Sequence, residues 1–141
     1  MARNRKDSRN STSNSRTPPH SHDAEQATLG AMMLDKKGVA RAGSVLGDEG
    51  NHFYSPAHDT IYRVIMKLFK FQEAIDITTV ANEIERMGKL DDCGGRSYLA
   101  KLAAGVATVE NVEHYAGIVR NKSALRQIIK GSTDVIAECF R

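Results

Sequence analysis

The last quarter of the chain, residues 108–141, constrains the fold more than any other stretch. Its apolar residues recur at helical spacing along the whole length, and no proline interrupts them. Thr108 is a favoured N-cap residue, and Glu110 and Glu113 put negative charge where a helix dipole stabilises it. At about 1.5 Å per residue, such a helix would extend roughly 50 Å. That length exceeds the width of a small domain, so only the first part is expected to pack on the chain's own core.

The far part of this helix, from about Leu125 to Phe140, is called the arm here. It carries an apolar stripe that the rest of the chain is not expected to cover, made of Leu125, Ile128, Ile129, Val135 and Ile136. Because exposed apolar surface favours association, the stripe predicts a weak, concentration-dependent dimer. Fraying of the arm is the alternative, since Gly131 weakens a helix by about 1 kcal/mol relative to alanine.

The region before the arm's helix, residues 19–107, is called the head and predicts short helices without any required strand. Capping residues and glycines divide it into expected helices at residues 21–34, 36–46, 55–70, 77–87 and 95–104. Ser21 or Asp23 can cap the first, and Ser55-Pro56 is a strong start signal for the third. The predicted fold class is therefore all-α: a compact bundle of five to six short helices, followed by a long C-terminal helix, residues 108–141.

Two polar positions within these helices need an interpretation. Glu25 and Gln26 lie near the start of the first expected helix, opposite its alanine face, and are expected to project outward. His58 lies at the edge of the apolar stripe of the third expected helix, which should form the centre of the core. It could act as a metal ligand, a base or a hydrogen-bonded core residue. Because no matching ligand spacing accompanies it, the core role is favoured.

The basic character of the chain is confined to its beginning. Residues 1–20 hold five Lys and Arg side chains against one Asp, whereas the remainder holds 15 basic and 16 acidic side chains. Residues 1–18 are rich in Arg, Ser and Asn, lack an apolar set to bury, and are expected to form a disordered basic tail. This tail is either a solvated leader or a weak phosphate-binding segment. The charge balance of the remainder gives no indication of a nucleic-acid surface.

The sequence offers no complete catalytic, cofactor-binding or metal-binding motif. Gly88-Lys89-Leu90 lacks a phosphate-binding loop and its hydroxyl residue, and Gly94-Gly95-Arg96-Ser97 lacks the lysine. No local motif pairs Cys93 with a histidine that could activate it. The two cysteines are not spaced as a disulfide framework, and no apolar leader or membrane-length run is present. We therefore expect a cytoplasmic, non-enzymatic chain without cofactor or membrane partner.

Taken in order, the motifs resemble the N-terminal domain of DnaB-type replicative DNA helicases. Each motif is weak alone, but the ordered set over residues 19–141 is specific. The matching motifs are Pro19-His20-Ser21, Ala24-Glu25-Gln26-Ala27, Leu29-Gly30, Phe53-Tyr54-Ser55-Pro56-Ala57-His58, Ile75-Asp76-Ile77-Thr78-Thr79-Val80, Gly88-Lys89-Leu90, Gly94-Gly95-Arg96-Ser97-Tyr98-Leu99 and Thr108-Val109-Glu110-Asn111-Val112-Glu113-His114-Tyr115-Ala116.

This resemblance implies a head followed by an α-hairpin, of which residues 108–141 match the first helix. In the family the hairpin pairs subunits into a hexameric ring collar that receives primase, and a motor domain uses ATP and Mg. Carried over residue by residue, Glu25 and Tyr98 match positions implicated in helicase–primase communication. Their alternatives are a helix N-terminal charge for Glu25 and partial core burial for Tyr98.

The resemblance leaves three hypotheses for this chain. It implies a collar domain that binds copies of itself and primase, and that reaches DNA only through the full-length ring. The basic tail, residues 1–18, allows a weak nucleic-acid-binding protein. The absence of motor-domain motifs allows a stand-alone regulator that docks on a helicase collar.

Overall fold

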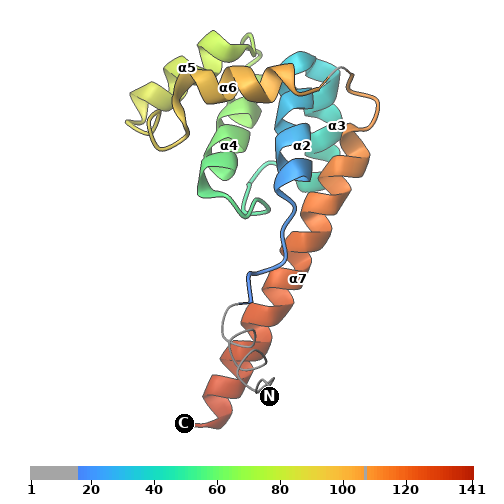
Figure 1. The fold of residues 1–141 in the computed structure, drawn as a ribbon, viewed down its shortest axis with the longest axis vertical. Helices are drawn as coiled ribbons and strands as arrows, with labels where there is room; N and C mark the ends of the chain where they lie inside the picture. The colour runs from blue at the N-terminus through green and yellow to red at the C-terminus, as the bar shows by residue number, and fades with distance from the viewer. Residues whose placement is uncertain (1–15, 107) are drawn as a thin grey trace, which may run out of the picture.

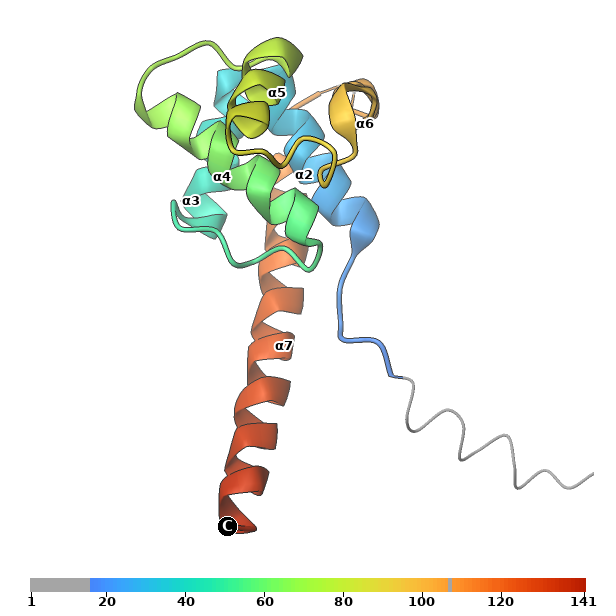
Figure 2. The same ribbon diagram turned by 90° about the vertical axis from the view of Figure 1, so that its left-hand side faces the viewer.

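The computed structural model describes residues 16–106 and 108–141, so residues 1–15 of the disordered tail expected over residues 1–18 lie outside this range. In the described part the chain forms six helices and no strand, which confirms the all-α prediction. They are α2 (His22–Leu34), α3 (Lys36–Leu46), α4 (Pro56–Lys70), α5 (Ile77–Arg86), α6 (Gly95–Ala104) and α7 (Val112–Cys139). Figure 1 shows α2 to α6 grouped into a head, with α7 extending far beyond it. Figure 2 shows the same separation from the side.

Side-chain caps set the starts of α2, α3, α4 and α5, whereas α6 begins after Gly94 without one. The Ser21 hydroxyl accepts a hydrogen bond from the Ala24 amide at 3.2 Å, so Ser21 rather than Asp23 caps α2. Ser55 caps α4 with Pro56 at its first position, as the sequence predicted. Asp76 caps α5 in a reciprocal capping box with Thr79. These local signals were sufficient to predict the bounds of the short helices.

The start of the long helix differs from the prediction. Thr108 does not cap it; its hydroxyl accepts a hydrogen bond from the Glu110 amide at 3.2 Å within a turn. Val109 packs against the core, and its carbonyl accepts a hydrogen bond from the Val112 amide. The chain therefore makes a turn here, and the helix begins at Val112 with Asn111 as its N-cap residue. The packing of the partly buried Val109 therefore outweighs the local capping preference of threonine. The helix has 28 residues, or about 42 Å at the usual rise.

The core is centred on α2, which packs against α3, α4, α6 and α7, whereas α4, the centre expected from its apolar stripe, packs against α2, α3 and α5. The centre of the α4 stripe is nevertheless fully buried. Ile61, Tyr62 and Ile65 of α4 are each 0% exposed. The crossing of α2 with α6 is very close, because a Cβ atom added at Gly30 would lie 2.3 Å from the Leu102 carbonyl oxygen. A side chain at Gly30 would therefore push the two helices apart. The same pair of helices carries Glu25 and Tyr98.

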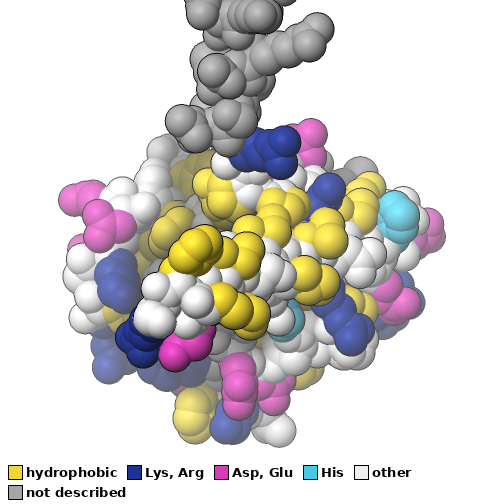
Figure 3. Space-filling model, turned by 90° about the horizontal axis from the view of Figure 1, so that it is seen from below, with side chains coloured by type: hydrophobic (Ala, Val, Ile, Leu, Met, Phe, Trp, Pro, Cys, Tyr) yellow, Lys and Arg dark blue, Asp and Glu magenta, His cyan; other side chains and the backbone are white. Residues whose placement is uncertain are grey.

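The long helix has two differently covered halves. Its first half packs against α2 and α3 through the buried residues Val112, Ala116, Val119 and Ser123. Beyond Ser123 every residue except Arg126 is exposed. Gly131 lies inside α7 without interrupting it. Figure 3, seen from below, shows hydrophobic side chains interspersed with charged ones on this side of the molecule. Among the described helices, none combines the length and apolarity needed to cross a membrane.

Candidate functional site

Three helices of the head bring Glu25, His58 and Tyr98 into one hydrogen-bonded network. The Glu25 carboxylate on α2 lies 2.8 Å from Nδ1 of His58 on α4. Nε2 of the same ring lies 2.5 Å from the hydroxyl of Tyr98 on α6. Glu25 is 2% exposed and His58 1% exposed, whereas Tyr98 is half-buried. We call these three residues the Glu25–His58–Tyr98 network.

This arrangement corrects one sequence expectation and confirms another. Glu25 does not project outward, because its side chain is needed to accept hydrogen bonds that the core cannot otherwise satisfy. Besides His58, it accepts the backbone amides of Tyr54 at 2.8 Å and Ser55 at 3.3 Å. His58 is a hydrogen-bonded core residue, as favoured from the sequence. Helical periodicity alone missed Glu25 because burial of a paired charge follows from tertiary contacts.

The network has a consistent direction of hydrogen bonding. An ionised Glu25 can only accept, so Nδ1 of His58 carries the proton and donates to it. With the proton on Nδ1 alone, Nε2 is an acceptor for the Tyr98 hydroxyl. The Tyr98 oxygen in turn accepts a hydrogen bond from the side-chain amide of Gln26 at 3.1 Å. The series therefore fixes the phenol of Tyr98 in one orientation at the edge of the head.

Two opposing influences act on the pKa of Glu25. Burial is the largest single influence and raises it. The hydrogen bond from His58 and those from the Tyr54 and Ser55 amides together outweigh burial and hold the pKa below its usual value. Glu25 is therefore an ionised group inside the protein, and its charge is retained because three donors face it.

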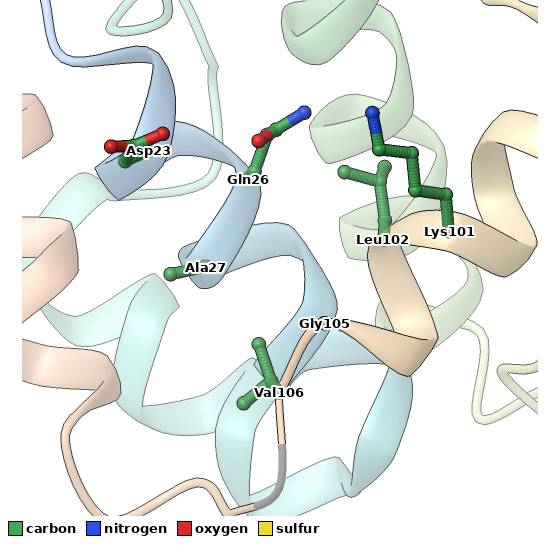
Figure 4. Close-up of a pocket in the computed structure, with 7 residues that line it drawn as sticks. All are labelled: Asp23, Gln26, Ala27, Lys101, Leu102, Gly105 and Val106. Atoms are coloured by element: carbon green, nitrogen blue, oxygen red, sulfur yellow. The ribbon is translucent and has the colours of Figure 1, made fainter.

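One cleft borders Tyr98, and a second adjoins it where α2 and α6 meet. The first, about 310 Å³, is bordered by His22, His58, Cys93 and Tyr98, among others. The second, about 300 Å³, lies between Asp23, Gln26 and Ala27 of α2 and the end of α6. Figure 4 shows the Gln26 side chain of α2 extending toward Lys101 and Leu102 of α6. Gln26 and Lys101 border both clefts, so the two hollows adjoin each other.

The polar groups around Tyr98 are engaged in hydrogen bonds or hold their protons. The oxygen of Tyr98 is already engaged by two hydrogen bonds, one from Gln26 and one to His58. Burial, reinforced by the charge of Asp92, raises the pKa of the Cys93 thiol, which disfavours the reactive thiolate. In the described part of the chain, no three His, Cys, Asp or Glu side chains are grouped to hold a metal ion. The site offers a fixed phenol beside two partly apolar clefts.

The second predicted set, the apolar stripe, lies far from Tyr98 on the arm. The exposed fractions of its members are 46% for Leu125, 63% for Ile128, 51% for Ile129, 63% for Val135 and 59% for Ile136. The structure therefore does not join Glu25 and Tyr98 with the stripe into one surface. Sequence reasoning missed Gln26 and Tyr54 as neighbours of the network. It also missed Arg126. The signal that could have found this residue is its position as a single arginine between apolar residues of the stripe.

Comparison with known proteins agrees with the motifs. The DnaB-like helicase N terminal domain matches residues 17–121. The chain is 39% identical over 120 residues to the replicative DNA helicase DnaB of Leifsonia xyli subsp. xyli, covering 85% of this chain and 26% of the relative. It is 40% identical over 125 residues to that of Geobacillus stearothermophilus, covering 89% of this chain and 27% of the relative.

A solved structure supports the same assignment. The crystal structure of the N-terminal domain of DnaB helicase from Mycobacterium tuberculosis superposes with a TM-score of 0.84 at 37% identity. The superposition covers 88% of this chain and 86% of the chain in the Mycobacterium tuberculosis structure. The present chain spans about a quarter of the length of the curated relatives named above. The resemblance inferred from the ordered motifs is confirmed, and the chain belongs to the DnaB-like helicase N-terminal domain family.

Proposed function

We propose that this chain acts as the collar domain of a replicative DNA helicase, with one surface for subunit association and another for primase. The observation that carries the proposal is the match to proteins named replicative DNA helicases, over 85% and 89% of this chain. In this proposal the arm pairs subunits, and the clefts around Tyr98 receive primase. DNA contact arises through the ring of the full-length protein. ATP and Mg belong to a motor domain of the longer relatives.

The arm supports the association half of the proposal. Five exposed aliphatic side chains line it, and leaving apolar surface wet is unfavourable by about 25 cal/mol per Å². A second copy with the same stripe provides a self-complementary cover, and a two-fold dimer is the commonest such arrangement. The isolated chain is proposed to form a weak dimer, and the hexamer requires the full-length protein.

The Glu25–His58–Tyr98 network supports the primase half. A tyrosine offers a large contact area and a polar tip at low entropic cost, which suits it to interfaces. Glu25 is too deeply buried to contact a partner, so its proposed contribution is to hold His58 and hence Tyr98 in place. Tyr98 makes the contact, and Glu25 acts as a positioning residue for it.

Removing only the phenol oxygen tests the proposed primase site. The Tyr98→Phe variant keeps the ring but loses the hydroxyl, so primase affinity measured by calorimetry should fall about tenfold, or 1.4 kcal/mol. Lys37→Gln changes an exposed residue on α3 and serves as the control with unchanged affinity. Equal affinity of Tyr98→Phe and the unmodified chain would remove Tyr98 from the proposed interface.

A second prediction concerns catalysis. The chain alone should hydrolyse no ATP, because neither of its glycine-lysine and glycine-arginine motifs completes a phosphate-binding loop. Phosphate release by the purified chain is the measurement. Turnover that persists through repeated purification and scales with the chain's concentration would contradict the prediction.

Two other functions remain as alternatives. Residues 1–20 carry five basic side chains against one acidic, which supports weak nucleic-acid binding through the tail. Deleting residues 1–18 while measuring DNA affinity against salt separates this from collar function, because tail-driven binding would collapse. A stand-alone regulator would instead bind a full-length helicase ring and change its activity. The cytoplasmic location also stays a prediction from the sequence.

A further inference from the structure

Arg126 joins three separate segments where α7 leaves the head. Its Nη1 donates a hydrogen bond to the Pro19 carbonyl at 2.7 Å, and its Nη2 donates to the His52 carbonyl at 2.7 Å. Pro19 belongs to the segment before α2, and His52 belongs to the loop between α3 and α4. In Figure 1 the segment before α2 lies beside α7. A single guanidinium therefore ties two loops to the base of the arm.

Aromatic stacking completes this contact. The Arg126 guanidinium carbon lies 5.6 Å from the centroid of the Tyr54 ring, in the range of a cation–π interaction. The Tyr54 ring also stacks on His20, with 4.1 Å between centroids and 19° between planes. Arginine suits this position, because its planar fork can donate in two directions while it stacks. A lysine would supply the charge from one nitrogen and could not reproduce both features.

The loop held by Arg126 is also the loop that stabilises Glu25. The Tyr54 amide donates to one carboxylate oxygen of Glu25 at 2.8 Å, and the Ser55 amide donates to the other at 3.3 Å. Glu25 then bonds His58, which bonds the Tyr98 hydroxyl. A continuous series of contacts thus runs from the base of the arm to Tyr98. Its links are hydrogen bonds, one cation–π contact and the backbone of the α3–α4 loop.

We propose that Arg126 is a positioning residue that holds the α3–α4 loop in place for Glu25 and thereby couples the arm to the phenol of Tyr98. Movement of the arm's base on association would shift the guanidinium, and the loop would carry that change to the Glu25–His58–Tyr98 network. The effect on the loop and Glu25 stands on the contacts alone. The effect on partner binding rests on the proposed function of Tyr98.

The first test measures the loop directly. Arg126→Gln removes the charge and the fork, Arg126→Lys keeps the charge, and Arg120→Gln makes the same change at an exposed position of α7. Amide hydrogen exchange should be at least about tenfold faster at Tyr54 and Ser55 in both Arg126 variants and unchanged in Arg120→Gln. The Glu25 carboxyl pKa, followed by carbon NMR, should rise in the Arg126 variants because two of its donors are loosened.

The pattern of exchange decides between positioning and general stabilisation. Faster exchange confined to the loop, with cooperative melting of the head retained, supports the proposal. Faster exchange spread evenly over the head would overturn it, because Arg126 would then only stabilise the fold. Unchanged exchange at Tyr54 and an unchanged Glu25 pKa would also overturn it.

The second test measures the coupling to Tyr98. Primase affinity of Arg126→Gln should fall about fivefold, the low end of ordinary couplings between sites. The double variant with Tyr98→Phe should lose little more primase affinity than Tyr98→Phe alone. Once the hydroxyl is absent, its displacement can no longer weaken binding. Fully additive losses would overturn the coupling. If Tyr98→Phe alone leaves affinity unchanged, the proposed function fails, and exchange and the Glu25 pKa still decide the role of Arg126.

Discussion

The two halves of α7 belong to one continuous helix but differ in what covers them. In the first half Val112, Ala116 and Val119 are at most 1% exposed, whereas in the second half Ile128 and Val135 are 63% exposed. Starting a helix is costly and extending one is not, so the packed first half can support the exposed second half. The comparison teaches that the first half of α7 is part of the packing of the head, whereas the second half extends from it with its apolar residues exposed.

The largest expected effect on stability appears when an isoleucine is replaced by alanine in the head and, for comparison, on the arm. Ile61→Ala in the head removes a fully buried side chain and should lower the free energy of unfolding by about 2–5 kcal/mol. Ile128→Ala on the arm should change it by less than about 0.5 kcal/mol in the monomer. Denaturant unfolding at low protein concentration measures both. Similar losses for the two variants would contradict the division of the chain into head and arm.

The next effect concerns the charged group inside the head. Glu25→Gln replaces a carboxylate, which only accepts hydrogen bonds, with a side chain whose NH2 group would face N–H donors. This variant should lower the free energy of unfolding by roughly 1–3 kcal/mol at neutral pH. The folded-state pKa of Glu25 lies below its unfolded value, so the carboxylate's contribution is fully present above an unfolded pKa of about 4.3. It is lost as the pH falls through the folded pKa.

Unfolding free energy measured against pH checks this sign. The unmodified chain should lose stability as the pH falls below about 5, and the Glu25→Gln variant should show a flatter curve over the same range. Lys67, on the surface of the head, pairs with Glu83 and provides a comparison. Lys67→Gln should leave the contribution of Glu25 in place. Parallel pH curves for the Glu25→Gln variant and the unmodified chain would show that Glu25 does not carry this dependence.

A smaller effect is expected at the start of the chain. Deleting residues 1–18 should leave the melting temperature nearly unchanged, because their composition offers no apolar set to bury. Deleting residues 1–20 also removes the Pro19 carbonyl and the His20 ring that contact Arg126 and Tyr54. The longer deletion should therefore lower the free energy of unfolding by about 1.5–3 kcal/mol, which is the range for a hydrogen bond to a charged group. A drop of several degrees for the shorter deletion would show that the tail packs on the head.

The sequence predicted the elements where the determining signal is local. Ser55-Pro56 and the Asp76 cap are read from neighbouring residues, and the ordered motifs identified the family. Thr108 misled because the cap preference competes with the packing of Val109, which depends on distant residues. Glu25 misled for the same reason: its donors come from a loop about 30 positions away in the chain.

The smallest expected effect on the head, and the sharpest test of the arm, is a double substitution on the apolar stripe. Ile128→Asp with Val135→Asp places two charges where the proposed dimer needs apolar contact. Both positions are 63% exposed, so the monomer should keep its helicity and its cooperative melting. Association, measured by sedimentation over a range of concentrations, should be abolished.

A change of opposite sign strengthens the same test. A Cβ atom added at Gly131 would meet no neighbouring atom within 4 Å, so Gly131→Ala fits without displacement. It should stabilise the arm's helix by about 1 kcal/mol and tighten the dimer, because less order must then be gained on association. If the unmodified chain and Gly131→Ala are both strictly monomeric at high concentration, exposure of the stripe alone does not drive pairing. The arm would then require the second helix of the hairpin, and the contrast between the two halves of α7 would describe an incomplete interface.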